Sequence, residues 1–278
     1  MTEIGPTSIV VGIDGSESSL RAATFARAYA DLHRLELVGV VAATDSLGLG
    51  HDDSIEPEVR DSLMSKVQAS LGEAGITIDE VSVAIGHPAT ALTELASPAA
   101  ALVVGARGIG GFSALLLGST TSACLSHARC PVIVIPAQNR IPIAPQGRIC
   151  VGVDGSAGSI AALKWALHEA AARPGCAVHA IAAWRAPHLW EPIQGGPSHY
   201  EERAERHLHV AVQAAGEAPV VLTSETQEGN AAAVLIDASS TSDLVVLGND
   251  RHEGGRFDGG ATPVAVASHS LCPVVIVP

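Results

Sequence analysis

The chain has 278 residues, enough for two domains of ordinary size, and 47% of them are hydrophobic although only 3% are aromatic. A formal net charge of −13 argues against general binding to nucleic acids or to anionic membranes, because both require a positive surface. No apolar stretch reaches the length of a membrane span, the first residues resemble no signal peptide, and the five cysteines include no C-x-x-C pair, so we expect a reduced, cytoplasmic protein.

Apolar runs and helical patterns alternate along the first half of the chain. Near-continuous runs of Val, Ile, Leu and Ala, typical of parallel strands covered on both faces, predict strands at 8–14, 36–42, 77–85, 101–105 and 132–136. Helices are predicted at 18–33, 57–71, 89–96 and 119–127, the first with a buried stripe of Leu20, Ala23, Ala26 and Ala30. Right-handed crossovers make this a doubly wound α/β sheet, in which ligands bind beyond the carboxyl ends of the strands.

The second half of the chain repeats the first. The hexapeptide VGIDGS at 11–16 recurs as VGVDGS at 151–156, and HARCPVIVIP at 127–136 recurs as HSLCPVVIVP at 269–278. The two pairs are offset by 140 and 142 positions, so little net insertion separates the halves. We therefore predict two copies of one domain, 1–137 and 147–278, joined by an aperiodic, proline-containing linker.

A glycine loop follows the fourth predicted strand. Gly105-Ala106-Arg107-Gly108 is followed after nine residues by Gly118-Ser119, which opens a predicted helix. Glycines allow close approach of a ligand to the backbone, and a helix N-terminus attracts anions. The loop could thus surround a phosphate with main-chain N–H groups, or it could be only a glycine-rich surface turn.

Two familiar phosphate motifs do not fit this loop. A Walker-type G-x-x-x-x-G-K-[ST] is absent, and the only lysines are Lys66 and Lys164. Gly108-Ile109-Gly110 hints at a dinucleotide fingerprint, but Ser113 stands where the third glycine belongs, and the loop follows the fourth strand rather than the first.

In four places the chain resembles the universal stress protein family in its tandem form. They are the VGIDGS segment, Gly86-His87-Pro88-Ala89 after the third predicted strand, the G-x2-G-x9-G-S loop, and His127 with Cys130-Pro131 before the last strand. The resemblance covers nearly the whole chain. It implies Rossmann-like domains of five parallel strands in the order 3-2-1-4-5, binding of ATP together with Mg²⁺, and association of domains through their last strands.

The resemblance also implies which residues of the first copy lie near the nucleotide. Gly12 and Asp14 match the first-strand positions, with Asp14 suited to a ribose hydroxyl or a metal-bound water, and Val40 matches the second-strand position that contacts adenine. The residues that match the phosphate loop are Gly105, Ala106, Arg107, Gly108, Gly118, Ser119 and Thr120. The Arg107 guanidinium could counter phosphate charge.

The second copy departs from this motif. Its fourth strand ends at Gly248, but Arg251 replaces the second loop glycine, Ala261 replaces the serine, and Pro263 follows closely. Asp250, Glu253 and Asp258 add negative charge, which is unfavourable beside a polyphosphate. We therefore expect this copy to bind ATP poorly or not at all.

The sequence favours a nucleotide-binding regulatory protein of the stress response over an enzyme. There is no lysine near the glycine loop, no evident general base beyond Asp14 and no second acidic metal ligand at a matching strand end, so we expect at most slow ATP hydrolysis. A slow ATP hydrolase and a nucleotide-independent interaction scaffold are the alternatives. The short apolar last strands predict pairing of the two copies within a chain, with a homodimer as a further possibility.

Overall fold

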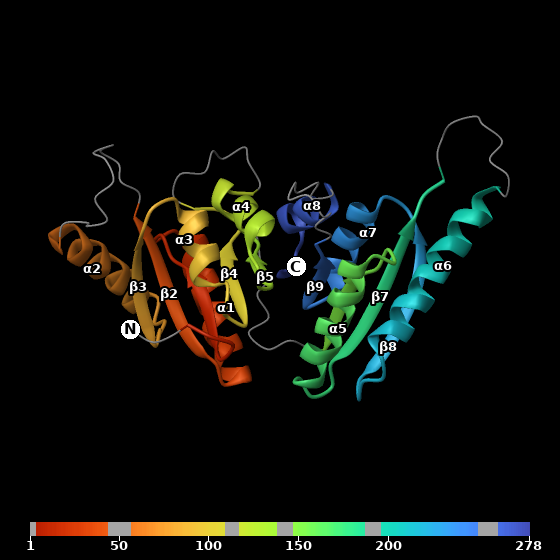
Figure 1. The fold of residues 1–278 in the computed structure, drawn as a ribbon, viewed down its shortest axis with the longest axis horizontal. Coiled ribbons are helices and arrows are strands. Elements are labelled where there is room, and N and C mark those ends of the chain that lie inside the picture. Colours follow the sequence, from red (N-terminus) through yellow and green to blue (C-terminus); the bar gives the residue numbers. More distant parts are fainter. Residues whose placement is uncertain (1–3, 44–56, 109–116, 138–146, 187–195, 250–260) are drawn as a thin grey trace. The chain divides into compact units, whose positions relative to one another are not determined.

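The computed structural model describes residues 4–43, 57–108, 117–137, 147–186, 196–249 and 261–278. The chain forms two compact units, Met1–Ala137 and Gln138–Pro278, each with alternating strands and helices (Figure 1). The predicted α/β fold, with a parallel sheet in each of two tandem copies, is confirmed. The part of the chain that is described contains no helix long and apolar enough to cross a membrane.

In the first copy, strand and helix alternate as the sequence predicts. The elements are β1 (Ser8–Gly12), α1 (Glu17–His33), β2 (Glu36–Ala43), α2 (Pro57–Glu73), β3 (Glu80–Ile85), α3 (Pro88–Leu95), β4 (Ala101–Gly105), α4 (Ser119–His127) and β5 (Val132–Ile135). All pairs are parallel: β1 pairs with β2 and β4, β2 with β3, and β4 with β5. The winding therefore reverses between β1 and β4, which is where a doubly wound sheet binds ligands.

The second copy repeats this arrangement. Its elements are β6 (Arg148–Gly152), α5 (Ala157–Ala171), β7 (Ala177–Trp184), α6 (Gly196–Ala215), β8 (Val221–Glu228), α7 (Ala231–Ala238), the short 3-10 helix η1 (Ser239–Thr241), β9 (Leu244–Gly248), α8 (Ala261–His269) and β10 (Val274–Val277). Here β6 pairs in parallel with β7 and β9, β7 with β8, and β9 with β10.

Small side chains bring helix α1 close to the sheet. Ala22, Ala23, Ala26 and Ala30 are fully buried where α1 packs on β1 and β4, whereas Leu20 of the predicted stripe is only half-buried. Thin alanine faces of this kind explain how a core with few aromatic residues is still filled. They also hold the first turn of α1 against the end of β4.

Three strands are shorter than predicted: β5 by one residue, β1 by two and β3 by three. Side chains of aspartate account for the differences in β1 and β3. β1 stops at Gly12 because Asp14 folds back: its carboxylate accepts a hydrogen bond from the Ser16 amide at 2.9 Å. β3 begins at Glu80, and the preceding Asp79 accepts from the Leu37 amide at 2.8 Å. That bond, together with the Arg27 guanidinium 2.9 Å away, lowers the pKa of Asp79.

Candidate functional site

The carboxyl ends of β1, β2 and β4 meet at one edge of the first sheet. Gly12 is paired with Val40 of β2, and Val11 with Val103 of β4, so the residues just beyond these strands lie side by side. Asp14 and Gly108 are in close contact there, because a Cβ placed on Gly108 would lie 2.4 Å from Asp14 Oδ2. The structure thus brings Asp14 to the start of the glycine loop.

Gly105 allows the first turn of α1 to sit directly on the end of β4. A Cβ at Gly105 would lie 2.4 Å from the Ser18 hydroxyl oxygen and 2.7 Å from the Ser18 carbonyl oxygen. Since the second of these atoms belongs to the backbone, no side chain larger than hydrogen fits. Packing of α1 on β4 therefore requires glycine at this position, in addition to any role that Gly105 has toward a ligand.

The two ends of the glycine loop come together at the start of α4. The Gly118 amide donates to the Ala106 carbonyl at 2.7 Å, and a Cβ on Gly118 would lie 3.8 Å from the Gly108 nitrogen. The buried Thr121 hydroxyl donates to the Gly105 carbonyl at 2.7 Å. Residues ten or more positions apart in the sequence therefore form one compact backbone cluster.

Several main-chain N–H groups in this cluster have no acceptor among the residues that the structure describes. The first hydrogen bond of α4 runs from the Ser122 amide to the Gly118 carbonyl at 2.9 Å, and no side chain caps the helix. The amides of Ser119, Thr120 and Thr121 therefore have no intrahelical acceptor. The Gly108 amide likewise has no acceptor among the described residues. Such a group of donors at a helix N-terminus favours an anion.

Arg107 adds positive charge beside these amides. Its side chain is half-buried, and its Nε atom is buried without a hydrogen-bond partner among the described residues. A buried donor without a partner costs roughly 1–3 kcal/mol, which an anionic ligand could recover. The Ser119 side chain is exposed and that of Thr120 is half-buried, so both hydroxyls are open to such a ligand.

Three of the residues predicted near the nucleotide have evident packing roles. A Cβ on Gly12 would lie 3.0 Å from Leu92 of α3, so this glycine makes room for the core. Val40 is only 1% exposed, and its carbonyl accepts from the Ile13 amide at 2.9 Å. The buried Ala106 donates to the Ile135 carbonyl at 2.8 Å. Contact of Val40 with adenine stays a prediction.

Sequence reasoning missed two residues that hold the cluster together, Ser18 and Thr121. The Ser18 hydroxyl accepts a hydrogen bond from the Arg107 amide at 3.3 Å, and the Thr121 hydroxyl donates one to the Gly105 carbonyl. Aligning the two copies could have found both residues. At the matching positions the second copy has Gly158 and Pro263, neither of which carries a hydroxyl.

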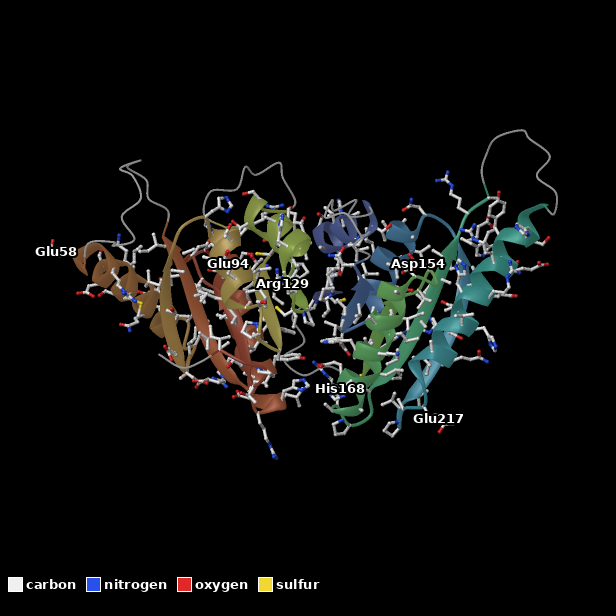
Figure 2. All side chains as sticks on the ribbon, viewed as in Figure 1. Glu58, Glu94, Arg129, Asp154, His168 and Glu217 are labelled. Carbon is white, nitrogen blue, oxygen red and sulfur yellow. The ribbon has the colours of Figure 1, made fainter. Side chains whose placement is uncertain are left out.

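The second copy keeps the strand end but lacks one main-chain donor at the start of α8. Asp154 lies just beyond β6 (Figure 2), where burial alone would raise its pKa, but hydrogen bonds from the Ser156 hydroxyl and amide hold it below the usual value. Pro263 in the first turn of α8 has no N–H, which removes one of the donors found in α4. A Cβ on Gly155 would lie 2.8 Å from the His207 ring, so α6 covers the turn after Asp154.

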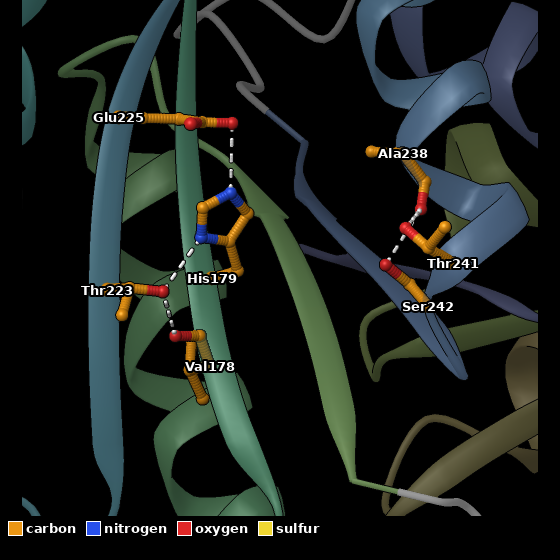
Figure 3. Close-up of polar contacts among 7 residues, drawn as sticks. All are labelled: Val178, His179, Thr223, Glu225, Ala238, Thr241 and Ser242. Carbon is orange, nitrogen blue, oxygen red and sulfur yellow. Dashed lines mark hydrogen bonds and ion pairs between the residues drawn. The ribbon is translucent and has the colours of Figure 1, made fainter.

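A second polar cluster, which the sequence did not suggest, lies in the middle of β7 and β8 (Figure 3). His179 Nδ1 is 2.8 Å from the Thr223 hydroxyl, and Nε2 is 3.1 Å from Glu225 Oε1. The Thr223 hydroxyl donates to the Val178 carbonyl at 3.4 Å, so its oxygen can accept from the ring. These contacts cross between neighbouring strands three or more residues before their carboxyl ends, as expected of side chains that stabilise the pairing of β8 with β7.

Parts of the chain that carried sequence predictions lie outside the described residues. These are the centre of the glycine loop with Ile109, Gly110 and Ser113, the linker at 138–146, and the loop residues of the second copy from Asp250 to Gly260.

Comparison with known proteins gives consistent matches over the whole chain. A model of the universal stress protein family matches residues 6–136 and again 146–278. Universal stress protein Rv2623 of Mycobacterium tuberculosis is 30% identical over 291 residues, covering 96% of this chain and 95% of that protein. The crystal structure of a universal stress protein from Archaeoglobus fulgidus shares the fold, with a TM-score of 0.68 at 16% identity over 99% of this chain and 98% of that one.

Proposed function

The chain belongs to the universal stress protein family, and we propose that its first copy, residues 1–137, binds ATP together with Mg²⁺. The observation that carries the proposal is the group of main-chain donors at Gly108, Ser119, Thr120 and Thr121. These donors suit the phosphates. The Nε of Arg107, which has no partner within the described part of the chain, adds a further donor and positive charge. The G-x2-G-x9-G-S spacing supports ATP in particular.

Asp14 completes the proposed site from the β1 side. Its carboxylate touches Gly108, where it can meet a ribose hydroxyl or a water on Mg²⁺. The metal would neutralise part of the phosphate charge. The loop itself brings no lysine to the phosphates, so the proposal is binding with at most slow turnover.

In this proposal the second copy binds no nucleotide and the protein acts as a regulator of the stress response. ATP favours one arrangement of the glycine loop and thereby shifts which partners the protein accepts. Pairing of the two copies through β5 and β10, and formation of a homodimer, are parts of the same proposal, supported by the short apolar character of these strands.

Calorimetric titration with ATP and Mg²⁺ tests the proposal. We expect one site per chain, and at least tenfold weaker binding in Gly108→Ala because the new Cβ displaces the Asp14 carboxylate. A tenfold loss corresponds to about 1.4 kcal/mol. Gly72→Ala is the matched control, since nothing lies within 4 Å of a Cβ at that position. Two sites per chain, or unchanged binding by Gly108→Ala, would contradict the proposal.

A further inference from the structure

Ser18, in the first turn of α1, contacts the glycine loop. Its hydroxyl oxygen accepts a hydrogen bond from the Arg107 amide at 3.3 Å, and its main-chain carbonyl packs against Gly105. Ser18 therefore joins α1, the end of β4 and the first half of the loop. Its own side chain is half-buried.

The bond to Ser18 determines how the Arg107 peptide is oriented. With its N–H directed to Ser18, this peptide cannot also donate to a ligand, and its neighbour Gly108 carries the nearest amide without an acceptor among the described residues. The Gly108 nitrogen lies beside Gly118 at the start of α4. The hydrogen bond that fixes the Arg107 amide thus places the Gly108 amide beside the amides at the N-terminus of α4.

The second copy shows that the fold does not need this hydroxyl. Gly158 occupies the matching position, and the backbone of α5 still packs on the end of β9: a Cβ on Gly248 would lie 2.1 Å from the Gly158 carbonyl carbon. Both copies therefore keep the close contact between helix and strand end, whereas only the first copy has a hydroxyl there. Packing alone does not explain the serine.

We propose that Ser18 is a positioning residue that holds the Arg107 peptide so that the Gly108 amide faces the phosphates of a bound nucleotide. This inference rests on the proposed function, because it concerns the same site. Ser18 acts through Arg107 and need not touch the ligand. Its loss should weaken contacts to phosphate and leave contacts to the nucleoside intact.

The test compares ATP and adenosine binding by Ser18→Ala with that of the wild type. We expect threefold to tenfold weaker ATP binding, the loss of about one hydrogen bond, with adenosine affinity unchanged. Thr24→Ala is the matched control, because it removes, from the same helix, a hydroxyl whose one hydrogen bond among the described residues goes to the Leu20 carbonyl, at 3.0 Å. This variant should match the wild type for both ligands.

Hydrogen exchange of the Arg107 amide, measured by NMR without ligand, tests the bond itself, and it should be faster in Ser18→Ala. Unchanged ATP affinity in Ser18→Ala, equal losses for ATP and adenosine, or unchanged exchange would each overturn the inference while leaving the proposed function standing. A wild-type protein that binds no ATP would instead refute the proposed function, and this inference with it.

Discussion

At the scale of single residues, burial determines the reactivity of the cysteine thiols. All five lie buried, and burial raises the pKa of Cys124, Cys150 and Cys272 to about 12 and that of Cys130 to about 11. A thiol at such a pKa carries almost no thiolate near neutral pH and is a poor nucleophile. The five cysteines are therefore core residues.

We predict that these thiols resist alkylation by iodoacetamide at pH 8 in the folded protein and react fully in urea. Mass spectrometry of the modified chain would count them. Because the folded pKa values are raised, their contribution to stability is complete below the ordinary thiol value of about 9 and is lost as the pH rises toward 12. Rapid labelling of Cys124 in the native protein would contradict this prediction.

At the scale of elements, the same helix begins differently in the two copies. In the second copy Asn230 caps α7, its side-chain oxygen accepting from the amides of Ala232 and Ala233 at 3.1 and 3.3 Å. In the first copy His87 stands at the start of α3, where Pro88 follows and no side-chain cap bond forms. The sequence pattern predicted the first-copy helix, at 89–96, but could not rank the stability of the two helices.

Exchanging these caps should change stability in opposite directions. Asn230→Ala should lower the free energy of unfolding by about 1 kcal/mol, and His87→Asn should raise it by roughly 0.5–1 kcal/mol, because an asparagine side chain satisfies first-turn amides. Urea unfolding followed by circular dichroism measures both. An Asn230→Ala protein as stable as the wild type would show that the α7 cap contributes nothing.

At the scale of the whole molecule, the two copies share a fold but differ in their helix N-termini. The first copy has the Ser18 and Thr121 hydroxyls and a full set of amides at α4, whereas the second has Gly158 and Pro263. We therefore expect the proposed nucleotide site to be present once per chain. Binding would stabilise one half of the molecule selectively.

Hydrogen exchange with mass spectrometry should reveal that asymmetry. With saturating ATP and Mg²⁺ we expect slower exchange in peptides from β1 into α1 and from β4 and α4, and no change in the matching peptides of β6, β9 and α8. ATP at a hundred times its dissociation constant would add about 2.7 kcal/mol to stability. Equal protection of both copies would argue against a single site.

By itself the sequence determined the α/β class, the tandem repeat and nearly all element positions of the first copy, because buried parallel strands and alanine-faced helices leave strong periodic patterns. It also located the glycine loop, because the spacing of its glycines can be read directly from the sequence. Only the tertiary structure decided which amides are left without acceptors and that Ser18 and Thr121 hold the loop. It also showed that Gly12 and Val40 serve packing. Those properties depend on contacts between residues that are up to about ninety positions apart, and the periodicity of a sequence carries no information about such contacts.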